Sequence, residues 1–215
     1  ITDMSCAPLA LGQLSFGVSL RKLTEAYGVF PAEGILHYGR SYIAVYDREG
    51  RSILNKNISE KRIYSPETSR VMNQLLSSVV SDGTARQIKL KEVVDVAGKT
   101  GTSGNDRDRI FIGYTPYITA GIWTGYDRAD MPVGYNSPNH LQIWDEVMGK
   151  IHDKLFLNGY NEQIRCFNTN NLVVKPYCSK SGMQPKEECE YDEDAKIKFG
   201  YFKDGNLSEE KCNYH

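Results

Sequence analysis

The chain has 215 residues, 40% of them hydrophobic and 25% charged, and carries a formal net charge of −1 at pH 7. Such a chain can bury one sizeable core and still carry an appendage, whereas its near-neutral charge without a basic run argues against binding to nucleic acid or to a membrane surface. It has neither a signal peptide nor an apolar run approaching the roughly 20 residues of a membrane-spanning helix. Because the first residue is Ile1 rather than Met, we expect a piece of a larger protein, with its anchor and targeting segment upstream.

A helix and a hairpin are predicted in the first part of the chain. Ser19 is a suitable N-cap, and Pro31 limits the helix that follows it. The apolar residues on one side of this helix are Leu20, Leu23 and Tyr27. Residues 42–46 are rich in β-forming side chains, and the turn sequence 47–50 leads into an apolar pair at 53–54. Together these segments predict a hairpin.

A second helix is predicted to begin at Ser65 and to end at Gly83. Ser65 is the expected N-cap, with Pro66 at the first helical position. Its apolar residues recur every four positions and are expected to pack on a sheet; they are Val71, Leu75 and Val79. Arg70 and Asn73 are then expected to face solvent.

An apolar strand over residues 93–97 is expected to run into a small, polar edge. The edge combines two glycines, a lysine and two threonines: Gly98, Lys99, Thr100, Gly101 and Thr102. The glycines would let a ligand backbone lie alongside as an added strand, while the lysine and the threonine hydroxyls could bind a carboxylate. The Thr102 amide could serve as an oxyanion donor if a nucleophile stood opposite. A polar turn at the end of a strand is the competing interpretation.

Two strands and a long helix are predicted downstream of this edge. The strands cover 110–114 and 118–123 and form a compact antiparallel pair. The helix covers 141–157 and has a wide apolar stripe, formed by Ile143, Trp144, Val147, Met148, Ile151 and Leu155. Three glycines are expected to let this helix lie close to the strands: Gly113, Gly121 and Gly125. Neither His140 nor His152 has a second ligand at metal-binding spacing, so both are expected to be structural or exposed.

The five cysteines are unevenly placed. Four of them lie in the last fifty residues: Cys166, Cys178, Cys189 and Cys212. Clustered cysteines in a short polar stretch favour a disulfide framework and an oxidising compartment, with three possible pairings. Zinc is the competing interpretation, but no Cys-x-x-Cys pair exists, so no metal site is expected and a bridge between Cys178 and Cys189 is preferred. Cys6 is expected to be a buried free thiol.

The composition changes after Gly159, where asparagines crowd together and apolar periodicity stops. We therefore expect two parts, a first domain over 1–158 and a disulfide-bearing extension over 159–215. The extension has too few apolar residues for a large core of its own, so that cross-links are expected to hold it together.

Several blocks of this sequence resemble, in the same order, the transpeptidase domain of class A penicillin-binding proteins. The blocks are Leu9–Ser19, Glu25–Tyr27, Ser65–Thr68, Gly83–Ala85, Ala97–Thr102, Phe111–Pro116 and Trp123–Asp127. Lys-Thr-Gly is one of three motifs that penicillin-binding proteins share with class A β-lactamases. The segments around Cys178, Cys189 and 199–212 are similar to the cysteine-bearing C-terminal extension of some of these proteins.

The resemblance implies an α+β fold, in which an antiparallel sheet flanked by helices forms part of the penicillin-binding/serine-transpeptidase fold and precedes a cysteine-containing tail. It implies a peptidoglycan D,D-transpeptidase or carboxypeptidase that acts on D-Ala-D-Ala stem peptides and is acylated by β-lactams. Lys99 would hold the catalytic hydrogen-bond network, and Thr100, Gly101 and Thr102 would bind substrate, with the Thr102 amide completing the oxyanion hole.

The family also needs a Ser-x-x-Lys and a Ser-x-Asn motif before Lys-Thr-Gly, and both are expected upstream of this chain, which alone is then an incomplete enzyme. Three segments imitate these motifs: residues 19–22, 103–105 and 137–139. Ser19 lies where the family has an ordinary helix, and the other two segments follow Lys99 instead of preceding it. We expect none of the three to be catalytic.

The partners implied are the peptidoglycan stem peptide, β-lactams and the upstream half of the same protein. No nucleic acid, no membrane contact from this chain and no cofactor are expected. The expected location is the extracytoplasmic face of a bacterial cell membrane. Two alternatives stay open, a non-catalytic binding or scaffolding domain with this fold and a β-lactamase-type hydrolase, which shares the Lys-Thr-Gly edge.

Overall fold

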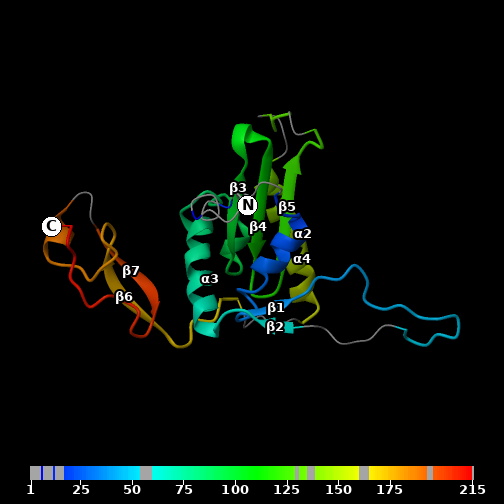
Figure 1. Ribbon diagram of the computed structural model, residues 1–215, viewed down its shortest axis with the longest axis horizontal. Helices are drawn as coiled ribbons and strands as arrows, with labels where there is room; N and C mark the ends of the chain where they lie inside the picture. The colour runs from blue at the N-terminus through cyan, green and yellow to red at the C-terminus, as the bar shows by residue number, and fades with distance from the viewer. Residues whose placement is uncertain are drawn as a thin grey trace.

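The centre of the molecule is a three-stranded antiparallel sheet (Figure 1). The structure is a computed structural model that describes residues 6, 12, 17–53, 60–128, 131–134, 139–159, 165–192 and 196–214. The strands are β3 (Ala97–Thr102), β4 (Asp108–Tyr114) and β5 (Thr119–Gly125), in the order β3-β4-β5. The two predicted strands after the polar edge are thus confirmed as β4 and β5.

Helices cover both faces of this sheet. On one face lie α2 (Leu20–Tyr27) and α3 (Pro66–Ser81), and on the other lies α4 (His140–Leu157). The side chain of Tyr114 points to the first face, where it packs with Leu76 of α3, whereas Phe111 points to the second, where its ring meets Trp144 of α4 edge-on at 5.1 Å. The expected α+β architecture is confirmed.

The two predicted N-caps are confirmed. The Ser19 hydroxyl accepts the backbone N–H of Lys22 at 3.4 Å, and the Ser65 hydroxyl accepts that of Thr68 at 3.3 Å. Both bonds satisfy one of the free N–H groups that every helix has in its first turn. Pro66 begins α3, where its missing N–H costs nothing.

The buried face of α3 differs from the prediction. Its buried residues are Ser69, Asn73, Leu76 and Val80, whereas Leu75, expected in the core, is 59% exposed. Arg70 and Asn73, expected to face solvent, are both engaged: Arg70 pairs with Glu33 at 2.5 Å, and Asn73 accepts the buried hydroxyl of Tyr114 at 2.9 Å. The apolar spacing holds for Val79, which packs against the core. It missed Asn73 because the buried partner of that residue is distant in sequence.

The strand predicted to begin at residue 93 begins at Ala97. A 3-10 helix covers Leu90–Glu92, and the Val94 amide still donates to Leu90 at 3.1 Å. Asp95 then pairs with a distant segment, since its amide donates to the Arg165 carbonyl at 2.7 Å and its carboxylate accepts the Phe167 amide at 2.9 Å. Val94 and Val96 are buried, as an apolar run should be, whereas Val93 is 44% exposed, and none of the three lies in a strand.

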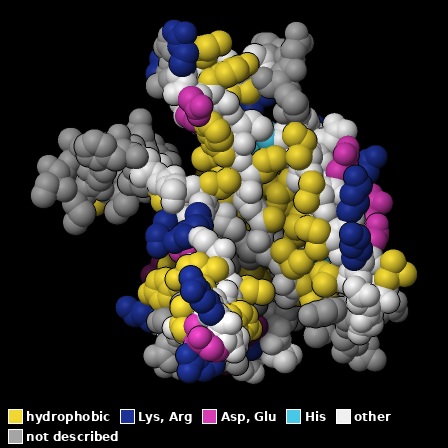
Figure 2. All heavy atoms as spheres, turned by 90° about the vertical axis from the view of Figure 1, so that its right-hand side faces the viewer, with side chains coloured by type: hydrophobic (Ala, Val, Ile, Leu, Met, Phe, Trp, Pro, Cys, Tyr) yellow, Lys and Arg dark blue, Asp and Glu magenta, His cyan; other side chains and the backbone are white. Residues whose placement is uncertain are grey.

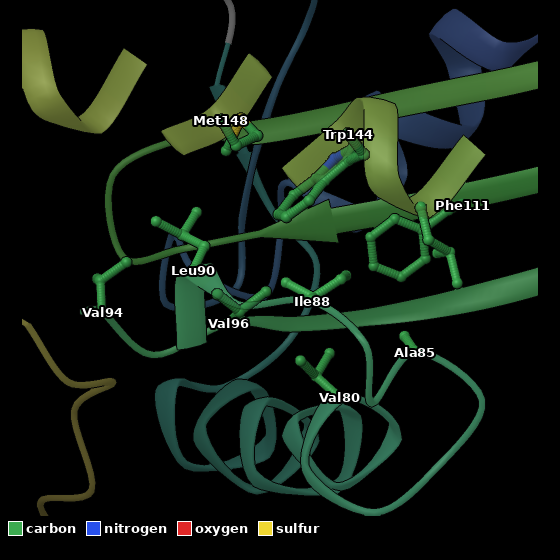
Figure 3. Close-up of a cluster of buried hydrophobic side chains, with 10 residues drawn as sticks. Val80, Ala85, Ile88, Leu90, Val94, Val96, Phe111, Trp144 and Met148 are labelled. Atoms are coloured by element: carbon green, nitrogen blue, oxygen red, sulfur yellow. The ribbon is translucent and has the colours of Figure 1, made fainter. Parts of the chain in front are cut away.

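The largest core lies between the sheet and α4. Figure 3 shows its side chains pointing toward one another from α3, the loop after it, β4 and α4. Its buried members are Val80, Ala85, Ile88, Leu90, Val94, Val96, Phe111, Leu141, Trp144 and Met148. Burying a side chain the size of Trp144 or Met148 stabilises the fold by about 1.5–3 kcal/mol, so that α4 is firmly attached to this face.

The predicted stripe of α4 is correct for two buried residues and for Ile151, which packs against the same core. Trp144 and Met148 are buried, whereas Ile143 is 38% and Val147 50% exposed. Gly113 serves as expected, since a Cβ there would lie 2.6 Å from the Trp144 ring. The other two glycines serve different neighbours: a Cβ on Gly121 would meet Thr24 of α2, and one on Gly125 would meet the ring of Trp123.

The predicted hairpin over 42–54 is only partly formed. The turn is present, with the Asp47 carboxylate accepting the amides of Glu49 and Arg51, but only an isolated bridge from Tyr46 to Ser52 follows. The second expected strand ends at Leu54, which lies outside the described residues. Two short strands that were not predicted, β1 (Ile35–His37) and β2 (Glu60–Arg62), pair with each other instead.

The C-terminal tail forms a small unit beside α3 (Figure 1). Two strands, β6 (Leu172–Cys178) and β7 (Ile197–Lys203), pair antiparallel, with the short helix α5 (Glu188–Tyr191) between them in sequence. Lys203 reaches the Ser65 hydroxyl at 3.3 Å. The boundary between residues 158 and 159 stays a prediction, and the packing on the first unit extends to Phe167, which lies in the core beside Tyr114.

The cysteines differ from expectation in two respects. Cys6 is exposed, and so it is not the buried thiol predicted. All five cysteines lie in the described part of the chain, and no disulfide joins any of them. Among the described helices, none has the length and apolar character that crossing a membrane requires.

Candidate active site

The polar edge predicted from the sequence is strand β3, the terminal strand of the sheet in the described part of the chain. Its pairing with β4 places Lys99 opposite Ile112 and Thr102 opposite Arg109. The last residues of β3 are partly or fully exposed, unlike Ala97 and Gly98 at its start. Strand β3 is therefore buried where it begins and accessible where it ends.

The backbone of β3 leaves hydrogen-bonding groups on its outer side. The amide of Ser103 donates to Asp108 at 3.0 Å, on the side of β4. Because successive N–H groups of a strand point to opposite sides, the amide of Thr102 points to the outer edge. A peptide that lay along this edge would find the Thr102 N–H facing it.

Lys99 carries a positive charge at this edge. Side chains alternate along a strand, and Ala97, two residues earlier, packs with Leu76 of α3, so Lys99 lies on the face that α3 covers. Its side chain is exposed, and its ammonium donates to the neighbouring Thr100 carbonyl at 2.8 Å. This position leaves two of the three ammonium hydrogens for other acceptors.

The two threonines lie on the opposite face of the strand from Lys99. The hydroxyl of Thr100 is 2.6 Å from that of Thr84, and Thr102 is exposed two residues further along. Thr84 belongs to the Gly-Thr-Ala block that the resemblance singled out without assigning it a role. The sequence analysis did not identify Thr84 as a neighbour of Thr100. The Gly-Thr-Ala block was the signal that could have pointed to it.

The two glycines of the edge have different surroundings. A Cβ on Gly98 would lie 2.6 Å from the Ile112 carbonyl oxygen and 2.7 Å from the Phe111 ring, whereas one on Gly101 would meet only Ile110, at 3.9 Å. Gly98 is therefore required by the packing of the sheet. The space beside Gly101 is open, so a ligand backbone can approach there.

The loop after β3 is held by its own charges. Arg109 binds both carboxylate oxygens of Asp106, and the hydrogen bond from Arg109 holds the pKa of Asp106 below its usual value. Asp108 accepts from the Ser103 hydroxyl and from the Trp123 indole N–H, both at 2.8 Å. These contacts hold the loop beside the exposed end of β3.

The serines that imitate catalytic motifs have structural roles where they are described. Ser19 caps α2, and the ammonium of Lys22 pairs with Glu25 at 3.4 Å. Ser103 is bonded to Asp108, and Ser137 lies outside the described residues. A further Ser-x-x-Lys spacing begins at Ser208 in the tail, where the hydroxyl accepts the amide of Glu210 at 3.1 Å.

Neither histidine of α4 belongs to a group of three or more possible metal ligands among the described residues. His152 is buried, with one ring nitrogen 2.9 Å from the Thr115 hydroxyl and the other 2.8 Å from the Met148 carbonyl. Burial lowers the pKa of His140, and the nearby Arg109 lowers it further. Both fit the structural role expected for them.

The family model of the penicillin binding protein transpeptidase domain matches residues 3–149. The chain belongs to this family. Among its relatives are penicillin-binding protein 1A of Clostridium perfringens, 32% identical over 90% of this chain, and penicillin-binding protein 1F of Bacillus subtilis, 38% identical over 62% of it. The transpeptidase-family chain spans 23% and 20% of the lengths of these two relatives.

Solved structures of penicillin-binding proteins share the fold of this chain. The crystal structure of penicillin-binding protein 1A from Haemophilus influenzae has a TM-score of 0.66 at 17% identity, over 95% of this chain and 34% of that one. Penicillin binding protein 3 from Mycobacterium tuberculosis, in complex with ampicillin, has a TM-score of 0.54 at 20% identity, over 65% of this chain and 35% of that one. The expected partial penicillin-binding fold is thus confirmed.

Proposed function

We propose that this chain supplies the substrate-binding strand of a serine D,D-transpeptidase that acts on D-Ala-D-Ala stem peptides and is acylated by β-lactams. The observation that carries the proposal is the open edge of β3, where a lysine, two threonines and an outward backbone amide line up beside the unobstructed Gly101. Membership of the transpeptidase family supports the same reaction class.

In the proposed reaction a serine from the upstream half gives its proton to a lysine of the same half and attacks the carbonyl of the penultimate D-Ala. The carbonyl oxygen gains negative charge, which the Thr102 amide stabilises as an oxyanion donor, and terminal D-Ala leaves after taking a proton. An amine or water then attacks the acyl-enzyme ester, which gives cross-linking or carboxypeptidase activity. A β-lactam acylates the same serine.

Each site residue has a role in this scheme. Lys99 holds the hydrogen-bond network near the serine of the second motif, where its compact charge suits a proton-transfer site. Thr100 and Thr102 donate to the terminal carboxylate of the substrate. Gly101 lets the substrate backbone lie close enough to pair with β3.

The upstream half of the domain is the proposed partner of this chain. Strand β5 ends the sheet on the side away from β3 in the described residues, and unpaired strand edges bind further strands readily. An open cavity of about 770 Å³ lies beside it, lined by α2, by residues 116–121 and by part of the segment 31–39. Figure 2 shows this side of the molecule, where hydrophobic side chains gather in bands between the charged ones. We place the assembled protein on the extracytoplasmic face of a bacterial membrane.

Acylation of the complete domain by a fluorescent penicillin tests the proposal. We expect Lys99→Ala to slow acylation at least about a hundredfold, the order of loss found when a group that stabilises the transition state is removed. The matched control is Lys150→Ala, because Lys150 is an exposed lysine of α4 on the other face of the sheet. Equal acylation rates for the two variants would contradict the proposal.

The same assay separates the alternatives. A binding or scaffolding domain forms no covalent adduct with penicillin at all. A β-lactamase-type hydrolase forms one but releases it quickly, whereas a transpeptidase holds it. We expect a long-lived adduct.

A further inference from the structure

Three segments of the tail bring their cysteines together. Cys178 ends β6, Cys189 lies in α5, and Cys212 lies in the last segment of the chain. All three side chains have 0% exposure, and their sulfur atoms lie within 4.8 Å of one another. Among the described residues, no other His, Cys, Asp or Glu joins this group.

Backbone amides surround this group of sulfurs. The amide of Lys186 donates to the sulfur of Cys189 and that of Tyr214 to the sulfur of Cys212, both at 3.4 Å. N–H donors aimed at sulfur stabilise the charged form that binds metals.

The backbone also fixes the positions of the three segments. At the end of β6 a tight turn forms, in which Gly182 has a φ of +71° and its amide donates to the Cys178 carbonyl at 2.8 Å. The last segment pairs with the chain after this turn, since the amide of Cys212 donates to the Gln184 carbonyl at 2.8 Å. The sulfurs are thus held together by hydrogen bonds that do not involve them.

We propose that Cys178, Cys189 and Cys212 form a binding site for one thiophilic divalent cation of the zinc class. Ligands at about 2.3 Å from a tetrahedral zinc ion lie about 3.8 Å apart, so the sulfurs need to approach by no more than about 1 Å. Each thiol that binds releases its proton to solvent and forms a metal–sulfur bond. The fourth position of the tetrahedron is left to a water molecule.

The arrangement suits a cation better than the disulfide expected from the sequence. A disulfide has a sulfur–sulfur distance of about 2.05 Å and joins only two of the three residues. It would leave the third sulfur buried, with its N–H donor but without a bond partner. A cation uses all three sulfurs equally, and the spacing rule that argued against zinc does not apply when the ligands come from three separate segments.

The cation would also supply what the tail lacks as a folding unit. Its buried cluster consists of the three cysteines with Ile197 packed against them. Such a cluster is too small to hold a unit of this size, and structural metal ions commonly replace a core in small units. We therefore expect the cation to stabilise the tail and not to take part in acyl transfer.

Titration of the reduced chain with Co²⁺, without oxygen, tests the proposal. We expect one Co²⁺ per chain, with near-ultraviolet sulfur-to-cobalt charge transfer, the visible bands of a tetrahedral site, and displacement by one Zn²⁺. Cys178→Ser and Cys212→Ser should lose these bands. The matched control Cys166→Ser should keep them, because Cys166 is exposed and outside the group.

A second measurement covers the case in which the serine variants fail to fold. In the unmodified chain, Zn²⁺ should protect three of the five thiols from a thiol reagent, and a chelator should expose them. Absence of thiolate-to-cobalt bands in the unmodified chain would overturn the proposal. So would peptide mapping that finds Cys178 and Cys189 joined by a disulfide in the natural protein, which is the competing use of the same sulfurs.

Discussion

Gly98 and Gly101 belong to one motif, but each position requires glycine for a different physical reason. We expect Gly98→Ala to destabilise the fold, because its Cβ would lie 2.6 Å from the Ile112 carbonyl oxygen and overpacking of a fitted site costs about 1–3 kcal/mol. We expect Gly101→Ala to fold normally but to slow penicillin acylation, because its methyl group would point into open space that the ligand needs. Thermal unfolding and acylation rates of the complete domain measure the two effects.

The two variants serve as controls for each other. If Gly101→Ala acylated at the unmodified rate, the proposed approach of the ligand backbone to β3 would be wrong. If Gly98→Ala were as stable as the unmodified protein, the packing argument would fail.

At the residue scale, the sequence predicted which residues form the edge but not their surroundings. Lys99, Thr100 and Thr102 were identified because a lysine and two hydroxyls after an apolar run are unusual in a core. The contact between Thr100 and Thr84 joins residues that are 16 positions apart. No local pattern of spacing or polarity reports such a contact.

At the scale of elements, the buried Asn73 of α3 decides how this helix sits on the sheet. Its side chain accepts the Tyr114 hydroxyl at 2.9 Å and donates to the Phe30 carbonyl at 3.3 Å. Burial raises the pKa of Tyr114, so the hydroxyl stays protonated and available as a donor. The helix is thereby joined to β4 and to the turn after α2.

We expect Asn73→Ala to lower the free energy of unfolding by about 1–3 kcal/mol, because it leaves the buried Tyr114 hydroxyl without a partner. The control is Leu75→Ala on the same helix, whose side chain is 59% exposed and whose loss should change stability by no more than about 0.5 kcal/mol. Urea unfolding of the chain measures both. If Leu75→Ala lowered the free energy of unfolding more than Asn73→Ala does, the buried face of α3 would be the one predicted from the sequence pattern.

The ends of the helices were predictable but their buried faces were not, because the two depend on interactions over different distances along the sequence. The caps at Ser19 and Ser65 depend on an N–H three residues away, so the local sequence contains the whole interaction. The face of α3 depends on Tyr114, which is 41 residues from Asn73. The same holds for the segment before β3, where Asp95 pairs with the distant Phe167 instead of extending the strand.

At the scale of the whole molecule, the chain combines a sheet whose two outer strands pair with no further described strand and a tail with its own sulfur cluster. The resemblance predicted the first part correctly, since the family model covers residues 3–149. The grouping of Cys178, Cys189 and Cys212 was not predictable from spacing, because three separate segments contribute to it. The sheet and the sulfur cluster both depend on how segments distant in sequence assemble.

We propose that β3 lines an acylation site whose nucleophile comes from outside this chain. The most direct test is the intact mass of the complete domain, cut before Ile1 into two associated polypeptides and treated with excess penicillin. We expect one penicillin on the upstream polypeptide, no change in the mass of this chain, and no adduct when this chain is treated alone. An adduct on this chain by itself would rule out an outside nucleophile and point to one of the chain's own serines, Ser19 first.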